Sequence, residues 1–321
     1  MDSGRFTASL STTSKMKKYP LVFIADKDYL HYSLVNLINL QQQGFENLFI
    51  IMDSKETEEK FKLLKKHLQL NCQSLVYDIN KLIDENKKKA MDNHVTPFAY
   101  VSCKIPEIFP LYEYVMLLPV DCALDRLSEM NISTDFNQPI AAVPDLQSTQ
   151  ILINGIADDT YFNAGVLIFN IKKWNELKLS QEVTNLLKDG KTYIFHDQDI
   201  LNKVVNGSFH KLPGNLNSIP EALTEDKGEL IHFAGSSKPW MPNCNRIGVE
   251  RWQQNCLTAI LKIEGIKNST RLKIDNESAF KIRNGLKKLI KFFLKESYRI
   301  ESQTLRSEIE FSLNKLRSLQ R

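Results

Sequence analysis

Strands and helices alternate in the first part of this chain, and that alternation restricts its fold more than any other feature. Pro20 to Ala25 has the pattern of a buried strand, Tyr29 to Gln43 carries leucines at helical spacing, and Asn47 to Met52 is a second apolar strand. A strand, a helix and a strand in this order predict a β-α-β unit. We therefore expect an α/β fold whose mainly parallel sheet is covered by helices on both faces.

The same alternation continues further along the chain. Residues 56–69 form a Lys/Glu-rich amphipathic pattern that predicts a helix, and a further helix is expected to begin at Asp197. The remaining expected strands are Cys72 to Tyr77, Tyr114 to Val120, Val166 to Asn170 and Leu230 to Phe233.

The composition favours a protein of the cytoplasm. No apolar run approaches the roughly 20 residues that span a bilayer. Residues 1–18 are rich in Ser and Thr and lack an apolar core, so they predict a disordered leader and argue against a secretory signal. The five cysteines have no CxxC spacing, which favours a reduced compartment over a disulfide framework or a zinc site.

Charge is distributed unevenly between the body of the chain and its end. From Lys267 onward there are 14 Lys and Arg against 6 Asp and Glu, a charge of +8, so the rest of the +4 chain carries −4. A basic face on the folded core is expected of nucleic-acid-binding proteins, and we therefore expect no nucleic acid as a partner. The sequence predicts a body at residues 19–265 and a basic, amphipathic, helical tail at 266–321.

The tail has two interpretations. In residues 280–296 an apolar stripe is surrounded by lysines, which is typical of a helix lying on an anionic membrane surface. The alternative is a helix that docks on the body with solvated lysines. A second leucine pattern from Leu305 to Leu316 leaves pairing between subunits, and thus a homo-oligomer, open.

Acidic residues lie at the ends of two of the expected strands. In open α/β sheets ligands bind at the carboxyl ends of strands, where Asp26, Asp28 and Asp121 fall. Asp26 and Asp28 could contact a nucleotide, or they could simply cap the following helix.

Two later segments supply the other reactive groups. His196-Asp197-Gln198-Asp199 could be only an acidic first helical turn, and His232 could be only a buried core residue. Together with Asp121, however, they suit the cleavage of a sugar nucleotide. Asp121 and His232 could hold a divalent cation at the diphosphate, Lys238 on a Gly-Ser loop could add positive charge, and Asp197 with Gln198 could steady an oxocarbenium-like transition state.

These segments, in this order, resemble family 8 glycosyltransferases. The similarity extends from Pro20 to Trp252 and is carried by five segments: Phe-Ile-Ala-Asp-Lys-Asp-Tyr (23–29), Val-Asp (120–121), Tyr-Phe-Asn-Ala-Gly-Val-Leu-Ile-Phe-Asn-Ile-Lys-Lys-Trp (161–174), His-Asp-Gln-Asp-Ile-Leu-Asn (196–202) and His-Phe-Ala-Gly-Ser-Ser-Lys-Pro-Trp (232–240).

The resemblance implies a GT-A fold, a UDP-hexose donor, a Mn²⁺ or Mg²⁺ ion and retention of the anomeric configuration. It places Asp121 and His232 on the metal, and Asp197 and Gln198 beside the reacting sugar, with Gln198 in the position of the family's proposed weak nucleophile. The residues that it assigns to the donor are Ala25, Asp26, Asp28, Tyr29, Val120, Asn163, Ala164, Gly165, Gly235 and Lys238.

Two positions depart from the family pattern. The first acid of the family's Asp-x-Asp motif is replaced by Pro119, and the family's arginine falls near Ser102, with Lys104 two positions away. Three interpretations follow: an enzyme that uses Asp121, His232 and diphosphate oxygens, a variant that relies on Lys238 in place of metal, and a catalytically weakened sugar-nucleotide-binding pseudoenzyme.

The acceptor that the resemblance implies is a glycan, lipopolysaccharide or other glycolipid. The donor hexose, glucose or galactose, stays open, and a self-glucosylating initiator is a further alternative. A lipid-anchored acceptor would suit a cytoplasmic enzyme that sits peripherally on the inner face of the membrane.

Overall fold

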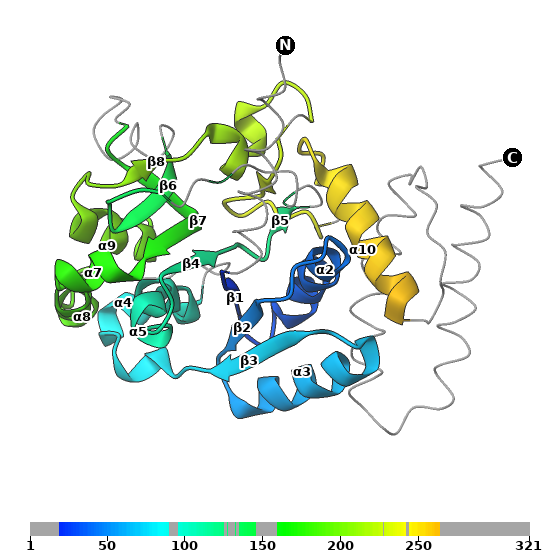
Figure 1. Cartoon of the computed structure of the whole chain (residues 1–321), viewed down its shortest axis with the longest axis horizontal. Coiled ribbons are helices and arrows are strands. Elements are labelled where there is room, and N and C mark those ends of the chain that lie inside the picture. Colours follow the sequence, from blue (N-terminus) through cyan, green and yellow to red (C-terminus); the bar gives the residue numbers. More distant parts are fainter. Residues whose placement is uncertain are drawn as a thin grey trace, which may run out of the picture.

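The computed structural model of the chain describes residues 19–89, 96–124, 127, 132, 135–145, 159–226, 228–241 and 244–263 (Figure 1). The expected leader at 1–18, the tail at 266–321 and its membrane-contact segment at 280–296 lie outside these residues. The division into a body and a tail therefore remains a prediction.

A seven-stranded sheet with the order β3-β2-β1-β4-β7-β6-β8 forms the centre of the fold. The pairs β1–β2, β2–β3, β1–β4 and β6–β8 are parallel, which confirms the mainly parallel α/β sheet. β7 is antiparallel to both β4 and β6, a reversal that the sequence pattern does not predict. The strands are β1 (Leu21–Ala25), β2 (Leu48–Met52), β3 (Cys72–Val76), β4 (Tyr114–Leu117), β6 (Ile140–Pro144), β7 (Phe162–Asn170) and β8 (His210–Lys211).

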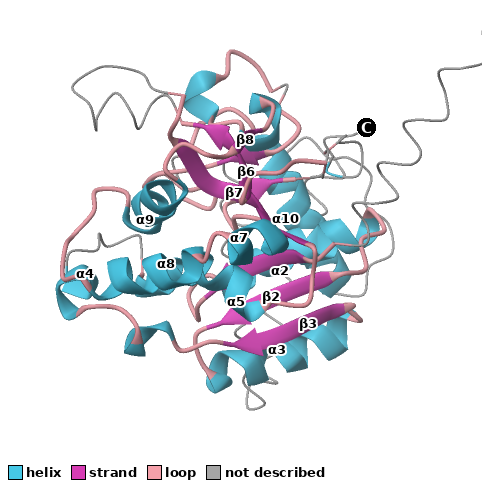
Figure 2. Ribbon diagram, turned by 60° about the vertical axis from the view of Figure 1, so that its left-hand side comes forward, coloured by secondary structure: helices cyan, strands magenta, loops and turns pink. Residues whose placement is uncertain are grey.

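Helices cover both faces of this sheet (Figure 2). One face packs against α2 (Leu30–Gln42), α3 (Lys55–Leu68) and α10 (Val249–Ile263), so that helices from the two ends of the described chain lie side by side. The opposite face packs against α5 (Ile105–Ile108), α7 (Ile171–Glu176), α8 (Leu179–Lys188) and α9 (His196–Val205). The remaining helices among the described residues are α4 (Glu85–Lys89) and the 3₁₀ helices Ile79–Lys81, Pro97–Lys104, Gly214–Asn217 and Pro220–Ala222.

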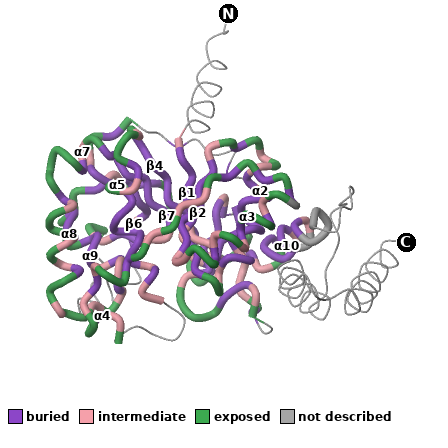
Figure 3. Tube along the Cα trace, turned by 90° about the horizontal axis from the view of Figure 1, so that it is seen from below, coloured by how far each residue is buried: buried purple, intermediate pink, exposed green. Residues whose placement is uncertain are grey.

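Side-chain alternation divides the core between the two faces. Leu21, Phe23 and Ala25 of β1 belong to the cluster under α2 and α10, whereas Val22 belongs to the cluster under α8 and α9. Because successive side chains of a strand point to opposite faces, a strand buried on both sides is apolar throughout. Figure 3 shows the result, with buried strands in the centre and exposed segments around them.

The strand expected at Tyr114 to Val120 ends earlier, at Leu117. Pro119 explains this boundary, because proline has no N–H to donate to a sheet ladder. After it the chain enters a separate two-stranded sheet, in which β5 (Cys122–Ala123) is antiparallel to β9 (Ile231–His232). β7 instead begins earlier than expected, at Phe162, so that Asn163, Ala164 and Gly165 belong to the strand.

The antiparallel direction of β7 decides where the polar residues meet. Since β7 runs against β4 and β6, its first residues lie at the same sheet edge as the ends of those strands. Asp26 after β1, Asp121 after β4, Asp145 after β6 and Asn163 in β7 therefore gather at one edge. Within the part of the chain that the structure describes, no helix is long and apolar enough to cross a membrane.

Candidate active site

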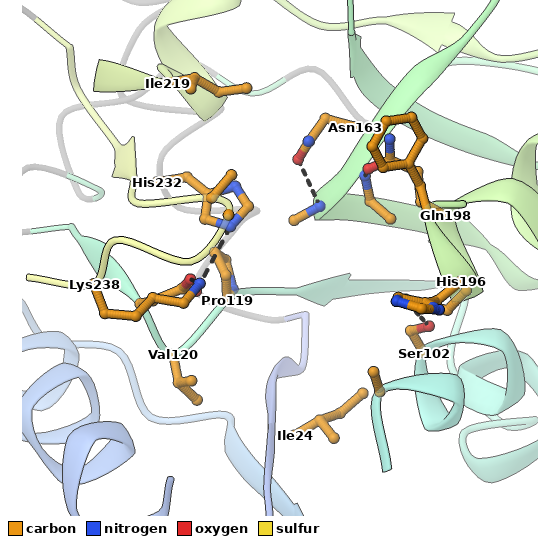
Figure 4. Close-up of a pocket in the computed structure, with 18 of the residues that line it drawn as sticks. Ile24, Ser102, Pro119, Val120, Asn163, His196, Gln198, Ile219, His232 and Lys238 are labelled. Atoms are coloured by element: carbon orange, nitrogen blue, oxygen red, sulfur yellow. Dashed lines mark hydrogen bonds and ion pairs between the residues drawn. The ribbon is translucent and has the colours of Figure 1, made fainter. Parts of the chain in front are cut away.

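A cavity of about 800 Å³ opens at this edge of the sheet (Figure 4). His232 and Lys238 stand on one side of it, with Gln198, His196 and Ser102 on the other. The structure brings together most of the residues predicted from sequence: Asp26, Tyr29, Val120, Asp121, Asn163, Ala164, Gly165, Asp197, Gln198, His232, Gly235 and Lys238 all line the cavity. Ala25 and the exposed Asp28 are not among its lining residues, and their contact with a ligand stays a prediction.

Asp26 organises the turn between β1 and α2. Its Oδ1 accepts hydrogen bonds from the backbone N–H groups of Asp28 (2.9 Å) and Tyr29 (3.1 Å), and its Oδ2 accepts one from the Thr96 hydroxyl (2.9 Å). Burial nevertheless raises the pKa of Asp26 above its ordinary value, although these hydrogen bonds act in the opposite direction. The carboxylate therefore stabilises the turn before α2, whose N-cap residue is Tyr29 and has no side-chain cap, and Asp26 also lines the cavity.

Backbone pairing between β5 and β9 places Asp121 beside His232. Cys122 is opposite His232 in the ladder, and the Phe233 N–H donates to the Asp121 carbonyl (2.9 Å). The side chains then converge, with His232 Nε2 lying 3.6 Å from Asp121 Oδ1. Burial, the largest influence, lowers the pKa of His232, which favours a neutral imidazole.

Lys238 contacts the other oxygen of the Asp121 carboxylate. Its Nζ pairs with Asp121 Oδ2 and donates to the Phe233 carbonyl (3.2 Å). Burial alone would raise the pKa of Asp121, but its polar neighbours, chiefly Lys238 through its charge and its hydrogen bond, lower that pKa overall. The carboxylate is therefore ionised, and a cationic side chain already balances part of its charge.

The residues present fit a divalent cation only in part. One carboxylate oxygen of Asp121 and one imidazole nitrogen of His232 converge, which is a suitable pair of donors. Pro119 lines the cavity but offers no carboxylate. Within the described ranges no group of three or more His, Cys, Asp or Glu side chains is placed to hold a metal ion. A cation here would need further oxygen ligands from its substrate or from water.

Asp197 begins the opposite side of the cavity, in the first turn of α9. The Ser102 hydroxyl donates to its Oδ2 (2.7 Å). Burial raises the pKa of Asp197 to about 6, even though the hydrogen bond from Ser102 lowers it. His196, just before it, has a φ of 51°, a left-handed conformation that non-glycine residues seldom adopt and that is concentrated at functional sites.

Gln198 has a fixed amide orientation. Its Oε1 accepts from the Ala164 N–H (2.9 Å), and its Nε2 donates to Asp145 Oδ2 (3.1 Å). One turn later, Asn202 donates to the Phe162 carbonyl (2.9 Å) and accepts from the Phe162 N–H (2.8 Å), which ties α9 to the start of β7.

Gly165 leaves room for the imidazole of His232. A Cβ at this position would lie 2.2 Å from His232 Cε1, 2.3 Å from Nδ1 and 2.9 Å from Asn163 Oδ1. No side chain fits against these atoms. The Asn-Ala-Gly segment of β7 thus shapes the side of the cavity where His232 lies, and its contact with a donor stays a prediction.

Several residues that line the cavity, or that contact its lining residues, were not predicted from the sequence. Asp145 follows a strand just as Asp121 does, so the strand-end pattern could have found it. Asn217, whose Oδ1 lies 3.0 Å from His232 Nδ1, carries no sequence signal. Lys104, the cation nearest to the missing arginine, is bound to Glu107 (2.8 Å) and Thr184 (2.7 Å) and does not line the cavity. The other lining residues without a prediction include Thr96, Glu221 and Arg246.

The chain has a mixed α/β sheet with a cavity at its strand ends, and its structural neighbours are glycosyltransferases of the GT-A fold. The family model described as "Glycosyl transferase family 8" matches residues 20–244, and the chain belongs to this family.

Three known proteins illustrate the similarity. General stress protein A of Bacillus subtilis is 23% identical over 252 residues, which cover 70% of this chain and 87% of that protein. Lipopolysaccharide 1,3-galactosyltransferase of Salmonella typhimurium is 24% identical over 260 residues, 71% of this chain and 74% of that one. The crystal structure of the galactosyltransferase LgtC with donor and acceptor sugar analogs has a TM-score of 0.57 and 22% identity, covering 78% of this chain and 97% of that one.

Proposed function

We propose that this protein transfers a hexose, glucose or galactose, from a UDP-hexose donor to a glycan or glycolipid acceptor, with retention of the anomeric configuration. The observation that supports this most is that Asp121, His232, Lys238, Asp197 and Gln198 line one cavity. His232 and Lys238 lie on one side of it and Gln198 on the other (Figure 4). Family membership and the sugar-transferring relatives support the same reaction.

The nucleotide and diphosphate would occupy the side of the cavity near β1, β5 and β9. Asp26 and Tyr29 lie there, and Tyr29 is further held by edge contact with Trp240 at 5.8 Å between ring centroids. Gly235, with a φ of 79°, allows the loop before Lys238 to turn without a side chain. The Lys238 ammonium could then stabilise negative charge that develops on the departing diphosphate.

Asp121 and His232 would hold a divalent cation together with diphosphate oxygens. Such a cation, when bound, supplies Lewis-acid stabilisation of the leaving group. This role depends on Asp121 sharing its carboxylate between the cation and Lys238. The variant that relies on Lys238 alone therefore remains a distinct outcome of the test below.

Asp197 and Gln198 would orient the sugar on the opposite side. The amide of Gln198 is held by Ala164 and Asp145, so its oxygen and nitrogen cannot exchange places without loss of both hydrogen bonds. A fixed dipole beside the anomeric carbon could stabilise positive charge there without reorganisation during the reaction.

The test is turnover of UDP-glucose and UDP-galactose with and without Mn²⁺. We expect Asp121→Ala and His232→Ala to lose most of the turnover, while Asp159→Ala, at an exposed ion pair with Lys211, keeps it. Turnover that survives both site substitutions would contradict the metal assignment. UDP binding without turnover of either UDP-hexose would favour the pseudoenzyme, which no contact in the structure supports.

Peripheral attachment to the inner face of the membrane is a separate part of the proposal. It rests on the lysine-rich pattern of residues 280–296, which would bind anionic lipid next to a lipid-anchored acceptor. Replacing Lys287, Lys288, Lys291 and Lys295 by Glu should abolish binding to anionic vesicles. Unchanged binding would exclude this segment as the anchor.

A further inference from the structure

Two hydrogen-bonded side-chain amides connect the start of β7 to the imidazole of His232. They belong to Asn163 and Asn217, which are 7% and 3% exposed. Asn217 Nδ2 lies 2.8 Å from Asn163 Oδ1, and Asn217 Oδ1 lies 3.0 Å from His232 Nδ1. Each amide can in principle be turned over, which exchanges its donor and acceptor ends. The donor and acceptor ends of these amides can therefore be assigned only from an anchor, a neighbouring group that can act only as a donor or only as an acceptor.

The backbone N–H of Gly165 is that anchor. It lies 2.9 Å from Asn163 Oδ1, and because a backbone N–H can only donate, the Asn163 atom that faces it must be the carbonyl oxygen. The Nδ2 of Asn163 then points to Asp145 Oδ2 (3.1 Å), a direction that suits an acceptor carboxylate. Two independent contacts thus agree on the orientation of this amide.

The fixed orientation of Asn163 sets that of Asn217. Since Asn163 offers an oxygen, the Asn217 atom opposite it must be the nitrogen, and the Asn217 oxygen faces His232. The Nδ1 of His232 must then carry a proton and donate it. In the neutral ring the other nitrogen, Nε2, presents its lone pair towards Asp121 Oδ1, 3.6 Å away.

We propose that Asn217 is a positioning residue, whose amide, oriented by Asn163, holds the proton of His232 on Nδ1 and directs the Nε2 lone pair at Asp121 and the cavity. A ring nitrogen that binds a cation must be unprotonated, and outer partners of this kind set which nitrogen is available. The consequence for cation binding rests on the proposed function. The position of the proton does not.

The decisive measurement is the His232 tautomer in the full-length protein without metal. Long-range ¹H–¹⁵N correlation spectra of histidine-labelled protein, assigned with His232→Ala, should show the proton of the neutral ring on Nδ1. A proton on Nε2 in the unsubstituted protein would overturn the inference. This result needs no turnover, and the His232→Ala variant serves only to assign the signal, so failure of the proposed function would leave the result unaffected.

Three variants test the role of Asn217 directly. Asn217→Leu removes the acceptor, so the proton should move to Nε2, where Asp121 can accept it, and Mn²⁺ affinity measured by electron paramagnetic resonance of the free ion should fall about 10- to 100-fold. Asn217→Asp keeps an acceptor and should keep the Nδ1–H tautomer. Asn215→Leu, on the exposed side of the same 3₁₀ helix, should change neither property.

The results separate a positioning role from a merely structural one. A folded Asn217→Leu protein with the Nδ1–H tautomer and unchanged Mn²⁺ affinity would overturn the proposal. Loss of affinity in Asn217→Asp equal to that in Asn217→Leu, with the Nδ1–H tautomer retained, would likewise show that the proton position does not govern cation binding.

Discussion

Replacing Gly165 by alanine adds one methyl group at the point where β7 meets the imidazole of His232. The φ of Gly165 is outside the left-handed region, so the backbone itself accepts alanine. The new Cβ would nevertheless lie 2.2 Å from His232 Cε1 and 2.3 Å from Nδ1. Carbon atoms in contact are about 3.5 Å apart, so the ring must move by about 1.3 Å or the strand must yield.

The size of the effect follows from that displacement. Overpacking of this kind costs about 1–3 kcal/mol of unfolding free energy. A displacement of about 1 Å at a reacting group lowers the rate about 10²-fold, so we expect kcat/KM for UDP-hexose to fall by that factor or more while the protein stays folded. The ring is also pushed away from Asn217, and Mn²⁺ affinity should fall with it.

The assay compares kcat/KM and thermal unfolding of Gly165→Ala with those of Gly214→Ala. Gly214 is the matched control, because an added Cβ there would meet no heavy atom within 4 Å. A Gly165→Ala protein with the turnover and Mn²⁺ affinity of the unsubstituted protein would refute the view that this glycine exists to seat His232. Equal losses in both variants would point instead to a general effect on folding.

The other predictions concern polar groups at the start of α9 and the residues in contact with them. The pKa of Asp197 is raised from 3.8 to about 6, so its contribution to stability is fully present below pH 3.8 and is lost as the pH rises through 6. Asp197→Asn should therefore have the same unfolding free energy as the parent near pH 4 and one about 3 kcal/mol higher at pH 8, measured by urea titration. If the two proteins were equally stable at both pH values, the raised pKa would be contradicted. Ser102→Ala removes a hydrogen bond that lowers this pKa and should shift the loss of stability to higher pH, a change visible in the same titrations. Tyr161→Phe deprives Asp199 of a hydroxyl donor at 2.5 Å and should cost about 1–3 kcal/mol in urea, so an unchanged unfolding midpoint would show that the contact is not stabilising.

Local patterns predicted several of the strands better than they predicted the pairing between strands, and they did not predict β6 or β8. The buried strands β1 and β2 were predicted within one residue, because an apolar run bounded by polar residues is a local signal. The reversal of β7 and the separate β5–β9 ladder depend on contacts between distant segments, for which a single sequence carries no comparable signal.

The candidate site shows the same division. Asp121 and His232 were predicted from chemistry and resemblance, and the structure brings them together. Asp145 directly follows a strand, as Asp121 directly follows an expected one, but no neighbouring residue in the sequence marked it as part of a site. Asn217 could not be predicted, because its position relative to His232 and Asn163 exists only once the 3₁₀ helix has packed against β7.

The β5–β9 ladder has a consequence for how the protein acquires activity during synthesis. It pairs Cys122 with His232, 110 residues later in the chain. Closing so long a loop is slow compared with forming the neighbouring pair β1 and β2, so the side of the cavity that holds Asp121 and His232 should be among the last parts to assemble. A nascent chain that has emerged only to about residue 225 would already contain every strand of the large sheet, yet it would lack His232 and Lys238. Ribosome-bound chains of increasing length should therefore become resistant to protease well before they bind UDP in the presence of Mn²⁺.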